Sequence, residues 1–384
     1  MKEVKGFKNA NILIEDGSII KADLLIENVK IKKIGKVDEV GLISLDDDKI
    51  IIPGFIDEHI HGSAGSDTMD GTYDDIRKIA EAIASEGTTA FLATTMTQSM
   101  ENIDKALANV NDYMKKDPET GARVLGVHLE GPFISTKHVG AQPIEYVAEP
   151  KVETFKHYEE VSGNHIKIVT LAVEVEGANK LVEYLASKNI VASIGHSDAT
   201  YEDCQKAIEA GAKNITHTYN AQRGLHHREV GTVGSAMLFD EVACEAICDG
   251  IHLSPAAIKL LWKNKPHDKF ILITDAMRAK HLQDGKSELG GQVVIVKNGE
   301  ARLENGTLAG SVLKMNNAVK NVMKFLDLPL AEVVTYASAN PAKALGLYDQ
   351  MGSIKEGKLA NLVIVDNDVN VYETIREGKI IYTK

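Results

Sequence analysis

The sequence predicts an α/β fold in which a (β/α)8 TIM barrel is joined to a small β-sandwich domain built from both chain termini. After Pro53, apolar runs alternate with longer helical segments, which is the pattern of parallel βα units. Strand-like sequence stands both before and after that region. We therefore expect 1–52 plus 350–384 to form the small domain and 53–349 to form the barrel, whose active site lies at the carboxyl ends of its strands.

Eight strands are predicted for the barrel, with helices between them. The strands are 54–60, 89–94, 123–129, 166–172, 190–194, 214–216, 244–247 and 270–274. The first five helices are 73–86, 100–116, 151–161, 178–188 and 201–210. The loop 130–150 is long for a compact domain, and such loops are often functional. Segment 292–308, with Asn298-Gly299 and Asn305-Gly306 as turns, predicts a hairpin inserted before the last helices.

The strands of the small domain are predicted from alternating runs that are separated by turn signals such as Asp16-Gly17. These runs are 10–15, 19–27 and 30–35. Strand-like sequence returns from Met351 onward, after the eight predicted βα units of the barrel. The C-terminus is therefore expected to rejoin the N-terminal sheet.

Composition favours a globular protein of the cytoplasm over a membrane or nucleic-acid-binding protein. The 384 residues are 44% hydrophobic and 26% charged, and no apolar run approaches the roughly 20 residues of a membrane span. A net charge of −12 disfavours a general nucleic-acid or anionic-membrane surface, so an anionic substrate needs a local basic pocket. The N-terminus shows no signal-peptide pattern. Cys204, Cys244 and Cys248 are sparse and suit a reducing compartment.

Possible metal ligands or proton carriers stand at the ends of five predicted strands. His59 and His61 are two residues apart on the first strand, so their imidazoles share a face. A single polar residue at a strand end usually caps the next helix, but a set of six at one rim of a barrel favours a metal site. The six are His59, His61, Glu130, His196, His217 and Asp275.

The side-chain types in this set narrow the choice of metal. Imidazole and carboxylate together suit a divalent transition metal (zinc, iron, cobalt or manganese) better than calcium or magnesium. A catalytic zinc lowers the pKa of its water from about 15.7 to about 7. Asp275 is our candidate for the base beside that water, and general acid-base action is worth about 10² to 10⁴ in rate.

At these positions the sequence resembles the amidohydrolase superfamily. The motifs HIHG, HLEGPF, IGHSDAT, THTYNA, CDGIHL and ITDAM are similar to those of its N-acetylglucosamine-6-phosphate deacetylase family, and the resemblance covers essentially the whole chain. The resemblance implies a hydrolase that converts N-acetylglucosamine 6-phosphate to glucosamine 6-phosphate and acetate, in amino-sugar catabolism and cell-wall recycling. It also implies one or two divalent metals per subunit.

The resemblance assigns the ligands to two positions. Glu130, His196 and His217 would hold the more constant metal, and His59 and His61 would hold a second one. Asp275 would be the catalytic base and acid. Most two-metal relatives in the superfamily bridge the metals with a carboxylated lysine on strand four. The only lysine of this strand, Lys167, lies near its start, so Glu130 would have to replace that bridge.

The substrate contacts are also implied by the resemblance. His252 would donate to the acetyl carbonyl as the oxyanion forms, and Asn220 with the backbone of Ala221 would bind the phosphate. Arg228 would reach the phosphate of a neighbouring subunit, which implies a homodimer. Arg228 belongs to a dense basic cluster with Arg223, His226 and His227. A solvated polar loop is the usual alternative, but an acidic protein that binds phosphate needs local cations.

Three more residues of the barrel are expected to support the site: His138, Gln142 and His128. His138 and Gln142 lie in the long loop after Glu130, and we expect them to form part of a lid over the sugar. His128 lies two residues before Glu130 and so would share its face one layer deeper, hydrogen-bonded to a ligand.

Two alternatives remain open. Another amidohydrolase, such as a cyclic-amide hydrolase or a ring deaminase, would keep the metal residues but would not need segment 220–228. A non-catalytic assembly protein on the same scaffold would have lost ligands, and none is missing from the sequence.

Overall fold

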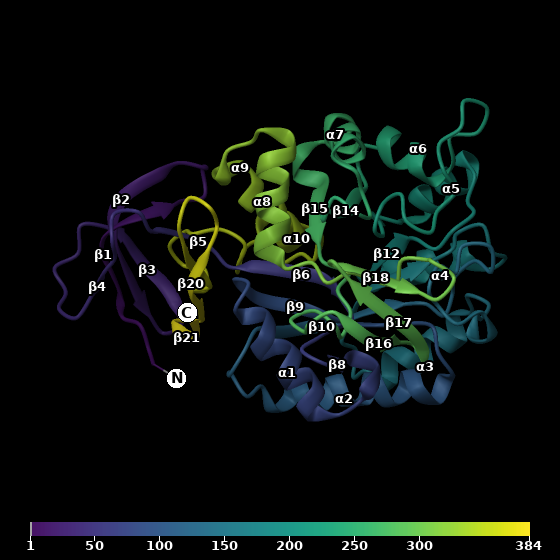
Figure 1. Cartoon of the computed structure of the whole chain (residues 1–384), viewed down its shortest axis with the longest axis horizontal. Coiled ribbons are helices and arrows are strands. Elements are labelled where there is room, and N and C mark those ends of the chain that lie inside the picture. The colour runs from purple at the N-terminus through teal and green to yellow at the C-terminus, as the bar shows by residue number, and fades with distance from the viewer. Residues whose placement is uncertain (1) are drawn as a thin grey trace.

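The computed structural model describes residues 2–384 and contains two eight-stranded sheets. One sheet lies in the small lobe at the left of Figure 1, where the purple N-terminal strands and the yellow C-terminal strands lie side by side. The other forms the barrel at the right, with helices around it (Figure 1). Among the described residues, none of the helices combines the length and apolar character needed to cross a bilayer.

The barrel sheet contains the eight predicted strands, each within one residue of its expected bounds at either end. Neighbouring strands pair in parallel throughout. In chain order, which is also their order in the sheet, the strands are β6 (Phe55–Ile60), β9 (Thr88–Thr95), β10 (Arg123–Glu130), β11 (Ile166–Leu171), β12 (Val191–Ile194), β13 (Asn214–Ile215), β14 (Ala243–Ile247) and β15 (Phe270–Ile273). The expected barrel is therefore confirmed.

The barrel closes where β6 meets β15. Ile60, the last residue of β6, forms a parallel bridge with Ala276 beyond the end of β15, and the Asp275 amide donates to the His59 carbonyl at 2.8 Å. Deeper in the seam, the buried carboxylate of Asp57 accepts the Thr274 hydroxyl at 2.6 Å. The closing contacts thus include backbone groups of two predicted site residues, which fixes their relative positions.

Four of the α-helices of residues 2–384 begin after a residue whose side chain caps them. The Ser99 hydroxyl accepts the Asn102 amide, and Thr200 forms a reciprocal capping box with Asp203. The α-helices are α1 (Tyr73–Ala84), α2 (Met100–Lys116), α3 (Val152–Val161), α4 (Ala178–Ser187), α5 (Tyr201–Ala210), α6 (Gly231–Leu238), α7 (Pro255–Asn264), α8 (Met315–Leu326), α9 (Leu330–Tyr336) and α10 (Ala339–Ala344). Short 3-10 helices are η1 (Thr68–Asp70), η2 (Ile144–Tyr146) and η3 (His267–Lys269).

The second large sheet joins the two ends of the chain. Its strands are β1 (Gly6–Leu13), β2 (Ile19–Glu27), β3 (Lys30–Gly35), β4 (Ile43–Ser44), β5 (Ile50–Pro53), β19 (Leu362–Val365), β20 (Val371–Arg376) and β21 (Lys379–Thr383). β19 pairs antiparallel with β5, with Leu362 opposite Pro53, so the C-terminus does rejoin the N-terminal strands. This sheet has a core of its own that includes Phe7, Leu24 and Ile375. We propose 1–52 plus 350–384 and 53–349 as the two domains.

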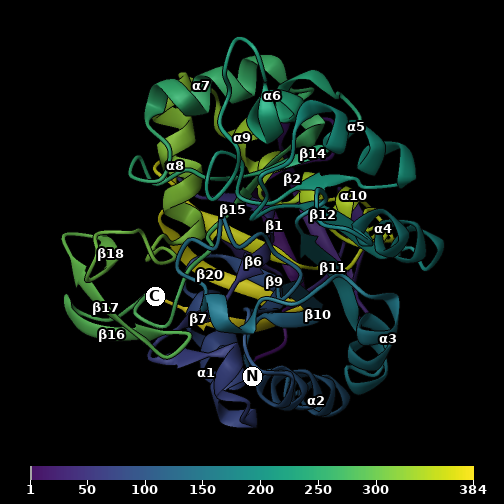
Figure 2. The same ribbon diagram turned by 90° about the vertical axis from the view of Figure 1, so that its right-hand side faces the viewer.

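The expected hairpin at 292–308 is part of a three-stranded antiparallel sheet. Its strands are β16 (Gly285–Leu289), β17 (Gln292–Lys297) and β18 (Glu300–Leu303), and it projects from the barrel at the left of Figure 2. The sequence GKSEL of β16 has no alternating apolar pattern, which is why it was not predicted as a strand. A short two-stranded sheet, β7 (Gly62–Ser63) with β8 (Ser66–Asp67), follows β6.

A buried ion pair joins the small sheet to the barrel. Arg376, at the end of β20, is 3% exposed, and its guanidinium donates to Asp117 at 2.6 Å and to the Gly121 carbonyl at 3.2 Å. Asp117 caps the C-terminus of α2. Because the two residues come from different lobes, this pair fixes how the lobes meet.

Candidate active site

The six predicted ligands come together at the carboxyl rim of the barrel. Glu130 is the last residue of β10 and His59 lies within β6, while His61 directly follows β6. The other three, His196, His217 and Asp275, each lie two residues beyond a strand and have left-handed backbone, with φ of 46°, 28° and 47°. Such strained backbone in non-glycine residues is concentrated at functional sites.

Glycines next to these ligands allow the close packing. A Cβ on Gly62, which follows His61, would lie 2.3 Å from the Ser66 carbonyl oxygen. A Cβ on Gly195, which precedes His196, would lie 2.6 Å from the Cβ of Thr216. The motifs HIHG and IGH therefore require glycine for steric reasons.

One group of ligand atoms is formed by Glu130, His196 and His217. Glu130 Oε1 lies 3.1 Å from His196 Nε2 and 3.0 Å from His217 Nε2, and the two nitrogens are 3.1 Å apart. All three side chains are buried. Ligand atoms around a tetrahedral zinc at about 2.0–2.1 Å lie roughly 3.3 Å apart, so this group has the spacing of a metal site.

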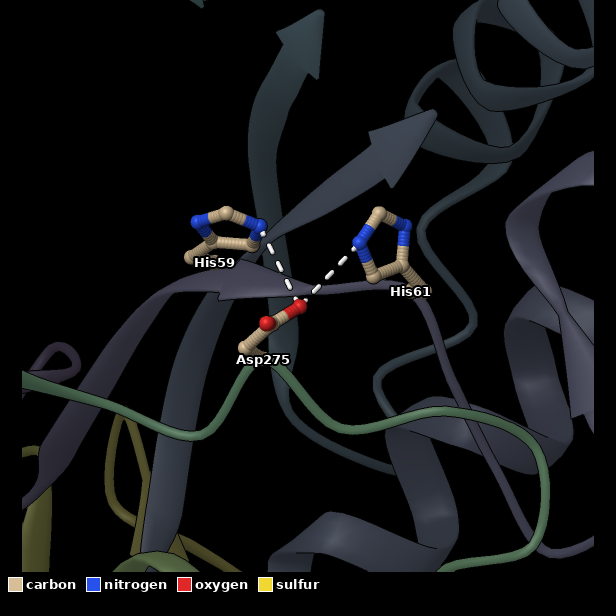
Figure 3. Close-up of side chains that lie close together, drawn as sticks. All are labelled: His59, His61 and Asp275. Atoms are coloured by element: carbon tan, nitrogen blue, oxygen red, sulfur yellow. Dashed lines mark ion pairs between the residues drawn. The ribbon is translucent and has the colours of Figure 1, made fainter. Parts of the chain in front are cut away.

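A second group consists of His59, His61 and Asp275, from β6, the residue after it and the loop after β15. Figure 3 shows both imidazoles turned toward one oxygen of Asp275. That oxygen, Oδ1, lies 3.4 Å from His59 Nε2 and 3.2 Å from His61 Nε2. His59 Nε2 is buried and has no hydrogen-bond partner within residues 2–384.

Glu130 connects the two groups. Its Oε1 faces His196, His217 and, at 3.5 Å, His59, while its Oε2 lies 3.2 Å from His61 Nε2. Lys167, the one lysine of β11, is exposed at the start of its strand. Glu130 is therefore within reach of histidines of both groups, as a replacement for the lysine bridge would have to be.

The electrostatics of the site also suit a cation. Burial raises the pKa of the Glu130 carboxyl, but the neighbouring imidazoles His59 and His196 outweigh burial and hold it well below its usual range. For His59, burial opposes protonation, but the carboxylates of Glu130 and Asp275 raise its pKa to about 9. The carboxylates thus favour positive charge between them. Buried imidazoles and carboxylates whose acceptor atoms converge fit a divalent transition metal.

A third cluster of possible ligands, His59, His128 and Glu245, lies deeper in the barrel. It does not form a metal site, because both ring nitrogens of His128 are already hydrogen-bonded. His128 Nδ1 donates to the Glu58 carbonyl at 3.0 Å, and its Nε2 accepts the Thr170 hydroxyl at 2.7 Å. We expected His128 to bond a metal ligand; instead its ring packs edge-on against His59, with ring centroids 4.5 Å apart. Burial and the neighbouring His59 lower the pKa of His128 to about 4, so its ring is neutral.

Five of the six predicted ligands, all except His59, line a cavity of about 240 Å³. The predicted substrate residues Gln142, Asn220, Ala221 and His252 line it. Gln142 Nε2 donates to Glu130 Oε2 at 2.9 Å. Leu289 and Leu308, from the three-stranded insertion, line it as well, so this insertion covers the site together with the long loop after β10.

Other predicted residues lie away from this cavity. The His138 imidazole lies 3.2 Å from Asp198, and only its backbone carbonyl reaches the site, where it accepts from His196 Nδ1 at 2.8 Å. Arg228 is exposed in the loop after β13, with its guanidinium 3.0 Å from His227. Arg223 pairs with Asp198 at 2.9 Å. The basic cluster therefore lies outside the cavity of its own subunit.

Two acidic residues of the site were not predicted. Asp249 Oδ2 accepts from His252 Nδ1 at 2.6 Å, and the spacing of Asp249 and His252 in CDGIHL was the available signal. Glu245 accepts from His59 Nδ1 at 2.9 Å. Glu245 sits in the apolar run of β14, and nothing in one sequence reveals that its side chain faces a histidine 186 residues away.

Comparison with known proteins places the chain in a family. Residues 50–381 match the model of the amidohydrolase family. An N-acetylglucosamine-6-phosphate deacetylase of Bacillus subtilis is 42% identical over 386 residues, covering 97% of this chain and 97% of that protein.

Solved structures agree over the whole chain. The N-acetylglucosamine-6-phosphate deacetylase of Thermotoga maritima is 38% identical, with a TM-score of 0.90 over 99% of this chain and 100% of that one. A variant of the Mycobacterium smegmatis enzyme, solved in complex with N-acetyl-D-glucosamine-6-phosphate, is 28% identical, with a TM-score of 0.92 over 100% of both chains.

Proposed function

This chain belongs to the amidohydrolase family, and we propose that it is a metal-dependent deacetylase of N-acetylglucosamine 6-phosphate. It hydrolyses the acetamide to give glucosamine 6-phosphate and acetate. The observation that carries this proposal is Glu130, which touches histidines of both ligand groups in a cavity also lined by Asn220 and His252. The full-length relatives favour this activity over cyclic-amide hydrolysis or deamination.

The ligands divide into two metal positions. Glu130, His196 and His217 form the first, and His59 and His61 form the second with one oxygen of Asp275. A zinc, iron, cobalt or manganese ion held there would act as a Lewis acid toward the amide carbonyl and make water a stronger acid. Glu130 serves both positions because its two oxygens face different histidines.

Asp275 moves the proton. The imidazoles His59 and His61 outweigh the effect of burial and lower its pKa to about 2, so the carboxylate is ionised and able to accept at neutral pH. Its Oδ1 faces the histidines, which leaves Oδ2 for a proton. Asp275 takes the proton from the attacking water and then delivers it to the departing amine.

His252 stabilises the charge that develops on the amide oxygen. Its ring lines the cavity, and its Nδ1 is held by Asp249 at 2.6 Å. As a donor to the oxyanion the ring would carry a hydrogen on each nitrogen, and the Asp249 carboxylate at Nδ1 would compensate the resulting charge. A donor fixed in this way costs no reorganisation when the oxyanion forms.

The phosphate is bound on the side of the cavity formed by the loop after β13. Asn220 and the backbone of Ala221 line the cavity there, with Ala221 in the left-handed region at φ 47°. Arg228 reaches the phosphate of a neighbouring subunit, which makes the enzyme a homodimer. This assignment is consistent with the exposure of Arg228 outside its own cavity. We place the reaction in the cytoplasm, because all three cysteines are free and buried.

Dependence on the 6-phosphate tests the proposal. Acetate release is measured from N-acetylglucosamine with and without the 6-phosphate, with metal content determined on the same sample. We expect turnover only of the phosphorylated sugar. Equal rates on both sugars would overturn the assignment, and hydrolysis of a cyclic amide instead would support the alternative. The galactosamine and mannosamine epimers, assayed in parallel, define the selectivity.

A further inference from the structure

The carboxylate of Glu245 lies beneath the site and contacts both ligand groups. It is on β14 and fully buried. Its Oε2 accepts from His59 Nδ1 at 2.9 Å and from the backbone amide of His217 at 3.1 Å. Its Oε1 accepts from Asn214 Nδ2 at 3.0 Å. One carboxylate is therefore hydrogen-bonded to a side chain of the second group and to the backbone of the first.

The contact with His59 decides which ring nitrogen can bind a metal. An ionised carboxylate only accepts hydrogen bonds, so His59 Nδ1 must carry the hydrogen. In the neutral ring the lone pair is then on Nε2, the nitrogen that faces Glu130 and Asp275 at 3.5 and 3.4 Å. Without a partner on Nδ1, the ring could place its hydrogen on Nε2 and lose its ligand atom.

His59 differs from the other three histidines of the site in the hydrogen-bond partner of its Nδ1 atom. His196 Nδ1 donates to a backbone carbonyl, that of His138. The Nδ1 atoms of His61 and His217 have no hydrogen-bond partner in the part of the chain that the structure describes. A carboxylate behind a ligating imidazole fixes its orientation and increases its basicity. Of these four histidines, His59 therefore depends most on a single neighbouring side chain.

We propose that Glu245 is a positioning residue that controls occupancy of the second metal position by fixing the tautomer and orientation of His59. This inference rests on the proposed metal dependence. It predicts that Glu245 acts on the second position much more than on the first, because its contact with His217 is to the backbone amide alone. Loss of such a partner typically weakens metal binding by about 10- to 100-fold.

The test measures bound zinc per chain after equilibrium dialysis at fixed free Zn²⁺. Two variants are compared with the wild type: Glu245→Met, which removes both the acceptor and the charge, and Glu245→Gln, which keeps an acceptor of the same size. Free zinc is set just above the level that saturates the wild type. We expect Glu245→Met to fall from about two zinc ions to about one, and Glu245→Gln to retain more of the second ion.

A control and a double variant show whether the effect passes through His59. Asp23→Asn changes a buried carboxylate of the small sheet, one bonded to Lys8, and should keep both ions. In a His59→Gln background, Glu245→Met should cause no further loss of zinc, because the side chain it acts through is already gone. A further loss would overturn the inference, and so would a wild type that binds only one ion or a Glu245→Met variant that keeps both with unchanged affinity. Acetate release by the wild type tests the proposed function separately.

Discussion

Gln142 and Glu130 are hydrogen-bonded side chain to side chain in the cavity, with Gln142 Nε2 2.9 Å from Glu130 Oε2. The Gln142 carbonyl accepts the backbone amide of Thr97 at 2.7 Å, which fixes the orientation of the amide. One lone pair of Oε2 is thus occupied by the long loop, and Oε2 also lies 3.2 Å from His61. The loop that we expected to form part of a lid therefore also orients a ligand.

Replacing this amide should weaken metal binding moderately. Gln142→Ala removes the bond that orients Glu130, so we expect an affinity loss of about 10- to 100-fold for the metal. Metal titration of the dialysed variant measures it. Gln350→Ala, at an exposed position, is the control. An unchanged affinity would mean that Glu130 is oriented without Gln142.

Neutralising Glu130 should weaken metal binding more than the Gln142→Ala substitution does. Glu130→Gln removes the charge that faces histidines of both groups, so we expect loss of bound metal and a fall in kcat of more than about 100-fold. Metal analysis and acetate release from the phosphorylated sugar, measured on one preparation, provide the comparison. If Glu130→Gln kept its full metal content and activity, Glu130 would not be the bridging ligand.

The proton-transfer role of Asp275 predicts a defect in turnover. Asp275→Asn keeps the shape of the side chain but cannot accept the proton, so kcat should fall by about 10² to 10⁴ while KM changes little. The first ligand group does not include Asp275, so at least one metal should remain. Activity within a few-fold of the wild type, with metal retained, would contradict the mechanism.

Arg228 provides a test of the dimer, because its proposed role is in the neighbouring subunit. Arg228→Ala and Asp275→Asn should each be strongly impaired alone. Mixed and allowed to exchange subunits, they should regain part of the activity, since one site of each hybrid then has a wild-type Asp275 and a wild-type Arg228 from its neighbour. Gel filtration confirms the dimer. Mixtures that remain as inactive as their components would show that Arg228 does not act across an interface.

The pair between Arg376 and Asp117 predicts a stability effect that depends on pH. Arg376→Met removes the buried partner of a carboxylate that is 28% exposed and keeps its contact with Arg123, so we expect a cost of about 2 kcal/mol of unfolding free energy. Burial raises the pKa of Asp117, but Arg376 and Arg123 outweigh it and hold the pKa below its usual value. The unfolded state therefore takes up this proton first, and the stabilisation is lost as pH falls below about 4.

Urea unfolding of the wild type and the variant between pH 3 and pH 7 measures this effect. The difference between the two proteins should shrink at the acid end. Lys379→Met, which breaks the more exposed pair with Glu119 at the same junction, should cost much less at every pH. A difference between wild type and Arg376→Met that stays constant with pH would exclude Asp117 as its cause.

Most of the barrel and the ligand set could be predicted because both depend on local patterns. His59 and His61 share a face by strand geometry, and strand order brings Glu130 to the same rim. β16 was missed because Leu289 is its single apolar side chain, so it shows no alternating pattern. The contacts of Glu245 with His59 and of Asp117 with Arg376 span 186 and 259 residues, respectively. Such pairings depend on tertiary packing, which one sequence does not display.

We expect this site to release acetate from N-acetylglucosamine 6-phosphate only when its metal ligands are loaded. The most direct measurement removes metal with a chelator, adds Zn²⁺, Fe²⁺, Co²⁺ or Mn²⁺ stepwise, and follows acetate release together with bound metal per chain. We predict negligible release without metal and release that rises in proportion to the metal bound by the wild type. Full acetate release from a metal-free sample would contradict the account.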